Sequence, residues 1–246
     1  EPGWATPVTM DTMSDAASEL TTPDPGTADP APQPIIAVLG GTGDQGLGLA
    51  YRWARAGLPV LIGSRQAERA ADAAAQVGFG VRGGTNAEVA AQCDIALVAV
   101  PWAGHEALLG DLARELAGKI VIDCVNPLAF DKQGSFPLAV AEGSAAQQAQ
   151  ALLPDSTVVG AFHHVSAVLL ADRDADSVPP MDILVLGDDR AATDTVQGLA
   201  DQIPGLRGVY GGRLRNCGQV EAFTANLISI NRRYKGHAGI QITDLG

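Results

Sequence analysis

The sequence predicts an α/β fold with a doubly wound, mostly parallel sheet, and two observations lead to this class. Short apolar runs, typical of strands buried on both faces, alternate with Ala-rich amphipathic stretches of helical length. A glycine-rich turn at 41–46 also joins the first expected strand to the first expected helix. Because strands and helices alternate, we expect helices to cover both faces of the sheet.

The first 33 residues differ in composition from the rest of the chain. They contain six prolines and six acidic residues, and no Lys, Arg or His. Such a segment buries too little apolar surface to offset the entropy that is lost on ordering. We therefore predict that residues 1–33 form a flexible, acidic, Pro-rich extension, held at most locally through Trp4 or Met10.

From residue 34 onward, the hydrophobic pattern places the individual elements. Strands are expected at 35–39, 60–62, 79–82, 95–100, 120–122, 158–162, 183–186 and 208–210, and helices at 47–56, 67–76, 105–116, 191–202 and 218–234. The alternation loosens after His164. We therefore expect a dinucleotide-binding domain at 34–165, followed at 166–246 by a smaller C-terminal α/β cap domain that completes a cleft.

Composition disfavours several classes of function. The formal net charge of −12 makes the chain a poor candidate for binding nucleic acid. No apolar run approaches the roughly 18 residues of a membrane span, and the N-terminus does not resemble a signal peptide. Three scattered cysteines form no disulfide pattern, and the four histidines lack metal-ligand spacing. We expect a cytoplasmic protein without a membrane span or a metal site.

The segment Gly41-Thr42-Gly43-Asp44-Gln45-Gly46 matches the GxGxxG pattern of Rossmann-type folds. Gly41 permits the tight turn, Gly43 lets the backbone approach a pyrophosphate, and Gly46 lets the helix pack close to the strand. The free N–H groups at the start of the helix then favour an anion. The alternative is a glycine-rich connection that binds no ligand.

The end of the second strand bears on which dinucleotide is bound. Sites for NAD usually place Asp or Glu here, against the ribose 2′-hydroxyl, whereas this chain has Gly63-Ser64-Arg65. Arg65 can hold a 2′-phosphate through two parallel hydrogen bonds, and Arg69 lies on the same helix face. Ser64 and Thr42 add hydroxyl donors, so we predict NADP(H). The alternative is that both arginines are solvated charges at a helix start.

The expected nicotinamide region lies beyond the carboxyl ends of three later strands. These ends carry Pro101-Trp102, Asn126-Pro127 and the run from His163 to Ala167. No Tyr-x-x-x-Lys pair is present, which disfavours alcohol oxidation because that reaction needs a base for the hydroxyl proton. The pattern suits a substrate that is itself a hydride-carrying ring, so we assign no catalytic acid or base.

Residues 207–235 contain six basic residues and one acidic residue in an otherwise acidic chain. This local charge fits an anionic partner, and it fits equally well a solvated basic end of the last helix.

Several linked motifs resemble those of the NADPH-dependent coenzyme F420 reductases. They are IAVLGGTG at 36–43, GSR at 63–65, VPW at 100–102, DCVNPL at 123–128, AFHHVSA at 161–167 and NRRYK at 231–235. The resemblance covers essentially residues 35–246 and is greatest to the actinobacterial branch. The archaeal members have His-Thr-Ile-Pro-Ala where this chain has 163–167, so the resemblance assigns no role to His164 or Ser166.

The resemblance implies reversible hydride transfer between C4 of NADP(H) and C5 of the deazaflavin coenzyme F420, by a homodimer. By motif, it implies that 42–45 line the pyrophosphate and that Ser64, Arg65 and Arg69 hold the 2′-phosphate. The other implied contacts are Trp102, Asn126 and Ala167 near the nicotinamide, and His163, Ala238 and Gly239 near the deazaflavin. The anionic tail of F420 would account for the basic stretch. An alternative for His163 is that it merely ends its strand.

Two other functions fit the same pattern. One is an NADP-dependent imine or carbonyl reductase, for which only the two adjacent histidines could donate the proton. The other is a non-catalytic Rossmann protein that senses NADP(H). Deazaflavin reduction in an absorbance assay distinguishes the three.

Overall fold

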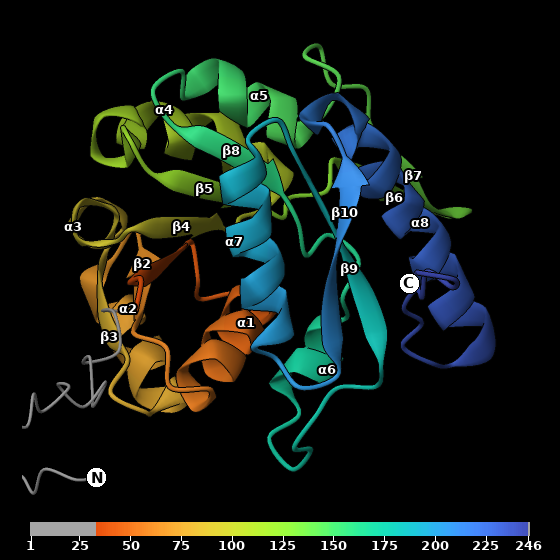
Figure 1. The fold of residues 1–246 in the computed structure, drawn as a ribbon, viewed down its shortest axis with the longest axis horizontal. Coiled ribbons are helices and arrows are strands. Elements are labelled where there is room, and N and C mark those ends of the chain that lie inside the picture. Colours follow the sequence, from red (N-terminus) through yellow and green to blue (C-terminus); the bar gives the residue numbers. More distant parts are fainter. Residues whose placement is uncertain (1–32, 246) are drawn as a thin grey trace, which may run out of the picture. The chain divides into compact units, whose positions relative to one another are not determined.

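An eight-stranded sheet runs through the described residues, 33–245, of the computed structural model (Figure 1). The strands are β1 (Ile36–Leu39), β2 (Val60–Ser64), β3 (Arg82–Thr85), β4 (Ile95–Val98), β5 (Ile120–Asp123), β8 (Thr157–Gly160), β9 (Met181–Gly187) and β10 (Leu206–Gly212). The acidic extension expected at 1–33 lies, apart from Gln33, outside the described residues.

The order of the strands confirms the predicted α/β class. Six strands, in the order β3-β2-β1-β4-β5-β8, are mutually parallel, which is the arrangement of dinucleotide-binding folds. β9 then pairs antiparallel with β8, and β10 pairs parallel with β9. The chain reverses its direction of winding between β1 and β4, so a ligand crevice is expected at the carboxyl ends of these two strands.

Helices cover both faces of the sheet, as the buried strands require. One face packs against α1 (Asp44–Arg55), α2 (Ala67–Val77), α6 (Ala167–Ala171) and α7 (Arg190–Asp201). The other packs against α3 (Asn86–Gln92), α4 (His105–Leu116), α5 (Ala145–Leu152) and α8 (Cys217–Tyr234). Alternate residues of β1 belong to the two cores: Ile36 and Val38 face one side, and Ala37 and Leu39 the other. None of the described helices is long and apolar enough to span a membrane.

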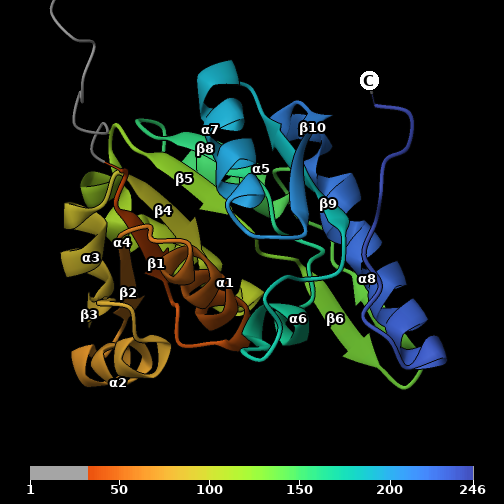
Figure 2. The ribbon, with the colours of Figure 1, turned by 60° about the horizontal axis from the view of Figure 1, so that its bottom comes forward.

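A two-stranded hairpin lies outside the main sheet and was not predicted. It consists of β6 (Leu128–Asp131) and β7 (Gly134–Pro137), and it lies beside α8 (Figure 2). The Ser135 hydroxyl donates to the backbone carbonyl of Ala225 over 3.1 Å, which ties the hairpin to that helix. The hairpin therefore joins the segment after β5 to the C-terminal helix.

The buried side chain of Arg52 fixes the segment that follows β8. Its guanidinium donates to four backbone carbonyls, those of Leu169, Leu170, Asp172 and Ala175. Only 2% of the residue is exposed. Because a buried guanidinium must be hydrogen-bonded, this arrangement holds α6 and the loop after it against α1.

The domain boundary expected near residue 165 falls between β8 and α6. The sheet continues past this point, since β9 and β10 belong to 166–246 and β9 pairs with β8. The two expected segments therefore share one sheet, and residues from Gln33 onward cluster as one compact unit.

Candidate active site

The turn between β1 and α1 takes its sharp shape from Gly40. This residue has φ of +66°, and a Cβ here would lie 2.1 Å from Cγ1 of Val100. We expected Gly41 to permit the tight turn. The structure requires glycine there for a different reason, since a Cβ on this residue would lie 2.8 Å from the Val38 carbonyl oxygen. The left-handed position therefore lies one residue before the GxGxxG pattern.

The other two glycines of the turn differ in what surrounds them. A Cβ on Gly46 would lie 2.8 Å from Cα of Gly41, so the helix does approach the strand closely. A Cβ on Gly43 would meet nothing within 4 Å. Gly43 is also the N-cap of α1 and makes no side-chain capping bond, which leaves N–H groups at the helix start available. This end of α1 has the form of an anion site.

Asn86, at the start of α3, holds the turn from outside and was missed by the sequence analysis. Its Oδ1 accepts a hydrogen bond of 3.1 Å from the Gly40 amide. The Gly41 amide donates to the Gly63 carbonyl at 3.0 Å, which ties the turn to β2. A capping box formed by Thr85 and Glu88 begins α3. Its Ser/Thr-x-x-Glu pattern could have identified this helix from sequence.

The residues expected to hold a 2′-phosphate lie at the end of β2 and on α2. Ser64 is buried, and its hydroxyl accepts from the Gln66 amide at 3.3 Å. Arg65 and Arg69 are both exposed, and neither forms an ion pair within residues 33–245. Two cationic side chains therefore stand beside the phosphate turn without a neutralising partner in the described structure.

A cleft of about 490 Å³ opens beside the turn. Eight of the expected site residues line it: Gly43, Asp44, Gln45, Gly46, Pro101, Trp102, Asn126 and His163. Much of its wall is apolar, with contributions from the end of β4, the hairpin and α8, among them Val100, Leu128, Phe130 and Ile228. The carboxyl ends of the parallel strands thus meet α8 across one cleft.

Other expected residues lie elsewhere. Ala167 lines a neighbouring hollow of about 520 Å³, together with His237 and Asp44, and Asp44 is shared with the main cleft. Pro127, Ala238 and Gly239 line neither space. The Ala238 amide donates to Asn231 Oδ1, and Gly239 packs on Met181.

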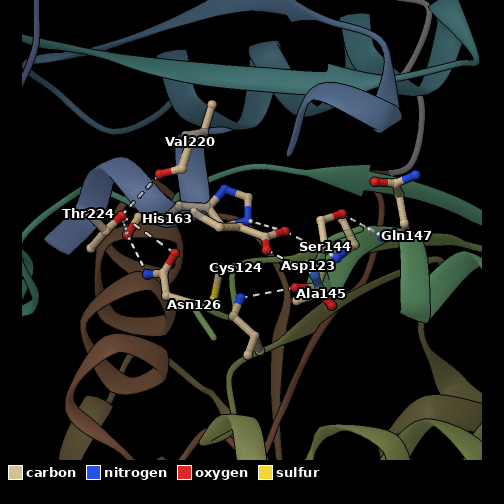
Figure 3. Close-up of polar contacts among 12 residues, drawn as sticks. Asp123, Cys124, Asn126, Ser144, Ala145, Gln147, His163, Val220 and Thr224 are labelled. Carbon is tan, nitrogen blue, oxygen red and sulfur yellow. Dashed lines mark hydrogen bonds and ion pairs between the residues drawn. The ribbon is translucent and has the colours of Figure 1, made fainter. Parts of the chain in front are cut away.

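Three side chains fix the backbone at the floor of the cleft. Asn126 Nδ2 donates to the His163 carbonyl at 2.8 Å, and the Thr224 hydroxyl lies 3.3 Å from the same oxygen (Figure 3). Gln45 Nε2 donates to the Phe162 carbonyl at 3.1 Å. Phe162 has φ of +61°, an uncommon backbone for a bulky residue, and such strain is often found at functional sites.

The His163 ring lies under the cleft rather than in it. The residue is among those that line the cleft, although its side chain has no exposed surface. Burial lowers the pKa of His163 to about 4, although the charge of Asp123 opposes this shift. His164 is also buried, and its Nε2 accepts from the Leu184 amide at 3.3 Å.

A buried ion pair next to the cleft was not predicted. His105 Nε2 lies 2.6 Å from Asp123 Oδ2, and His105 Nδ1 lies 2.9 Å from Gln148 Oε1. Burial lowers the pKa of His105, but the hydrogen bonds and the charge of Asp123 outweigh burial and leave it raised. Asp123 Oδ1 also accepts from the Val125 amide at 3.0 Å, and so shapes the turn that presents Asn126. An acidic residue ending an otherwise apolar strand could have drawn attention to this position.

Only part of the basic C-terminal stretch is free to meet an anion. Arg207 forms a two-bond pair with Asp182, at 2.7 and 2.8 Å, and Arg213 lies 3.7 Å from Asp188. Arg215 is exposed and forms no ion pair within residues 33–245, and three further exposed cations lie near the end of α8: Arg232, Arg233 and Lys235. Within residues 33–245, no group of three acidic, Cys or His side chains could hold a metal ion.

The family model described as NADP oxidoreductase coenzyme F420-dependent matches residues 35–127. The F420-dependent NADP reductase of Methanothermobacter marburgensis is 40% identical over 222 residues, which cover 85% of this chain and 98% of that protein. The chain belongs to the F420-dependent NADP reductase family. The reductase of Methanocaldococcus jannaschii is 38% identical over 223 residues, with 85% and 98% covered.

Solved structures agree with this family. A crystal structure from Arthrobacter sp. FB24, classed as a candidate F420-dependent NADP reductase, is similar with a TM-score of 0.73 at 26% identity. The similarity covers 85% of this chain and 99% of that one. A reductive aminase from Aspergillus terreus shares the fold, with a TM-score of 0.58 at 17% identity. The expected resemblance is thus confirmed.

Proposed function

We propose that this enzyme transfers hydride reversibly between NADP(H) and coenzyme F420. The observation that carries the proposal is the cleft itself. A helix N-terminus fit for a pyrophosphate opens onto a largely apolar wall, in a chain of the F420-dependent NADP reductase family. When bound, the dihydronicotinamide and the deazaflavin supply the hydride donor and acceptor. The chain's own residues then bind and orient the two rings and exclude water.

The chain's residues fit the phosphate groups of NADP(H) at two places. The open face of Gly43 and the start of α1 suit the pyrophosphate, with Thr42 adjacent. Arg65 and Arg69, with the nearby hydroxyl of Ser64, suit the 2′-phosphate.

The rest of the cleft suits the two rings. Trp102 and Asn126 suit the nicotinamide, at the carboxyl ends of β4 and β5. The face near α8 suits the deazaflavin, whose anionic tail would meet Arg232 and Arg233. In this scheme 34–165 hold NADP(H) and 166–246 complete the deazaflavin side.

An absorbance assay tests this function against the two alternatives. Protein, NADPH and oxidised F420 are mixed, and the visible band of the deazaflavin is followed; we expect rapid loss of the band. Tight NADPH binding with no loss would favour an NADP(H) sensor. Turnover with imines or carbonyls alone would favour a reductase of those groups, to which the shared fold with the aminase lends no more than structural support.

We also propose a homodimer through α8 and the hairpin. Six of the eleven exposed large apolar side chains in the described structure lie there: Phe130, Phe136, Leu138, Phe223, Ile230 and Tyr234. A groove of about 390 Å³ runs between the two elements. A second copy is the natural occupant, because an apolar face of this kind is costly to leave in water.

The three cysteines are free and buried, in keeping with a reducing cytoplasm.

Charge placed on this face should separate the subunits. We expect Phe223→Glu to elute as a monomer in size-exclusion chromatography with light scattering, because a carboxylate would be buried in the interface. Phe79→Glu is the control, since Phe79 is also an exposed phenylalanine but lies on the turn after α2. A wild-type chain that is already monomeric, or an F223E chain that remains dimeric, would contradict this interface.

A further inference from the structure

A carboxylic acid lies beneath the cleft and has no place in the scheme above. Glu221, on α8, is 3% exposed. Its Oε2 accepts from the Ala145 amide at 2.9 Å and its Oε1 from the Ala146 amide at 3.2 Å, so it joins α8 to the start of α5. The same Oε1 lies 4.0 Å from Nε2 of His163. An acid and an imidazole thus face each other under the cleft.

The His163 ring is unusual because neither ring nitrogen has a hydrogen-bond partner within residues 33–245. A buried polar nitrogen without a partner is costly, and a native chain that keeps one calls for an explanation. The backbone at this residue is well held, since its carbonyl accepts from Asn126. The ring nitrogens can therefore exchange a proton or a partner without disturbing the floor of the cleft.

Two charged neighbours act on Glu221 in opposite directions. Asp123 on β5 and His105 on α4 form an ion pair with each other; the charge of Asp123 raises the pKa of Glu221, and that of His105 lowers it. From α8 itself, the Cys217 thiol faces Glu221, and burial raises the pKa of that thiol so that it stays neutral.

Burial raises the pKa of Glu221 to about 7, against the lowering effect of the two amides from α5. Near neutral pH, therefore, Glu221 can gain or lose a proton while His163 remains neutral.

Few other ionisable groups line the cleft. Asp44 lies in the first turn of α1, on the side proposed for the pyrophosphate. The Cys124 thiol is buried, and burial raises its pKa. His163, with the acid behind it, is the remaining ionisable side chain among the residues that line this cleft, and His237 and Asp172 line the neighbouring hollow.

We propose that Glu221 holds the proton consumed when the deazaflavin is reduced, and that His163 passes it to the floor of the cleft. This inference rests on the proposed function. In the forward reaction a C4–H bond of NADPH breaks, and its electron pair and hydrogen form the C5–H bond of the deazaflavin. In one concerted step the reduced ring takes up the N–H proton of the neutral His163 ring while the other ring nitrogen takes the proton of Glu221, and Glu221 later recovers a proton from solvent. Glu221 acts through His163 and is a positioning residue.

Infrared spectroscopy of the protein without cofactors tests the proton store directly. We expect a carbonyl band of a protonated carboxylic acid to titrate near the Glu221 pKa of about 7 in the wild type. Glu142→Gln, which changes an exposed glutamate near α5, should keep the band, and Glu221→Gln should lose it. Absence of such a band in the wild type, or its survival in E221Q, overturns the proposal.

Kinetics test the transfer. In the wild type, deazaflavin reduction should slow as the pH rises through the Glu221 pKa, and the reverse reaction should slow as it falls, because the two directions need opposite protonation states. E221Q should lose both inflections and roughly a hundredfold in kcat, with the KM for NADPH unchanged. Glu142→Gln should behave as wild type.

Each result has one meaning. A wild-type enzyme that does not reduce the deazaflavin overturns the proposed function. If the wild-type enzyme reduces the deazaflavin and the E221Q variant has the same kcat and pH profile, the proposed proton transfer is wrong but the proposed function stands. If E221Q does not fold, Glu221→Asp replaces it, since a shorter side chain moves the carboxylate away from His163 and should reduce kcat while the infrared band remains.

Discussion

We propose that, at the scale of single residues, Arg65 and Arg69 set the preference of the cleft for NADP(H). Both are exposed, four residues apart, and the strand before them ends in Gly63-Ser64 without a carboxylate. An acid at this place would accept bonds from a ribose hydroxyl and repel a phosphate. Two guanidinium groups do the reverse, because each can hold phosphate oxygens through paired hydrogen bonds.

Arg65→Ala should therefore weaken NADP(H) selectively. Loss of a charged hydrogen-bonding group on a phosphate costs about 1.5–3 kcal/mol, which is roughly ten- to a hundredfold in Kd. Affinity for NAD(H), which lacks the 2′-phosphate, should scarcely change. Titration calorimetry with both cofactors checks this, with Arg114→Ala, on the exposed face of α4, as control. Equal losses for both cofactors would rule out a 2′-phosphate contact.

Residue-level prediction from the sequence was possible where the chemistry is local. The spacing of the glycines and the missing acid at β2 are contiguous in sequence, so they could be interpreted without the fold. The position of the His163 ring could not be predicted, because it packs 4.0 Å from Glu221, a residue of α8 that is distant in the sequence. Asn86 was missed for a similar reason: its partner, Gly40, is 46 residues away.

At the scale of elements, the long amphipathic helices were located closely. The helix expected at 105–116 is α4, and the one expected at 218–234 begins one residue earlier as α8. The short elements were missed or misplaced, and the strand expected at 79–82 lies instead at Arg82–Thr85 as β3. α3 and α5 have seven and eight residues, too few for a clear helical period. β3, the sequence RGGT, has no apolar side chain, and its Gly83 is required because a Cβ would lie 2.3 Å from the Ala70 carbonyl.

The start of α3 should matter to the neighbouring phosphate turn. Asn86→Ala removes the acceptor for the Gly40 amide, and we expect a loss of about 1 kcal/mol in the free energy of unfolding together with weaker NADP(H) binding. Thr85→Ala is the matched control, since it removes the α3 cap and leaves Asn86 in place. Urea unfolding and cofactor titration separate the effects. If T85A weakened NADP(H) as much as N86A, the turn contact would not be the cause.

At the scale of the whole molecule, stability is linked to histidines that the fold keeps neutral. Burial lowers the pKa of both His163 and His164 from 6.5 to about 4. The folded chain therefore binds fewer protons at these rings than the unfolded chain does, and stability falls as the pH drops below 6.5. Glu221 affects stability in the opposite direction, because folding raises its pKa from 4.5 to about 7. Its stabilising contribution to the folded state is fully present below pH 4.5 and is lost as the pH rises towards 7.

Between pH 6.5 and 4.5 the unfolded chain binds two more protons than the folded chain at the two histidines and one fewer at Glu221. The unfolded chain therefore binds one more proton in total. We expect the free energy of unfolding to fall by about 3 kcal/mol over this window as the pH is lowered. His164→Gln can still accept from the Leu184 amide, and it should flatten the dependence. Urea unfolding at several pH values measures this. A slope as steep in H164Q as in the wild type would show that other groups set it.

The guanidinium of Arg52 has a consequence for the order in which the chain is made. Ribosomes add residues from the N-terminus, so α1 exists long before the carbonyls of 169–175 that complete its hydrogen bonds. Until those carbonyls have been added, the Arg52 guanidinium must remain in water, and α6 cannot yet pack against α1. A nascent chain halted before Ala175 should consequently be digested readily by proteases at α1, whereas one extended through β10 should resist them.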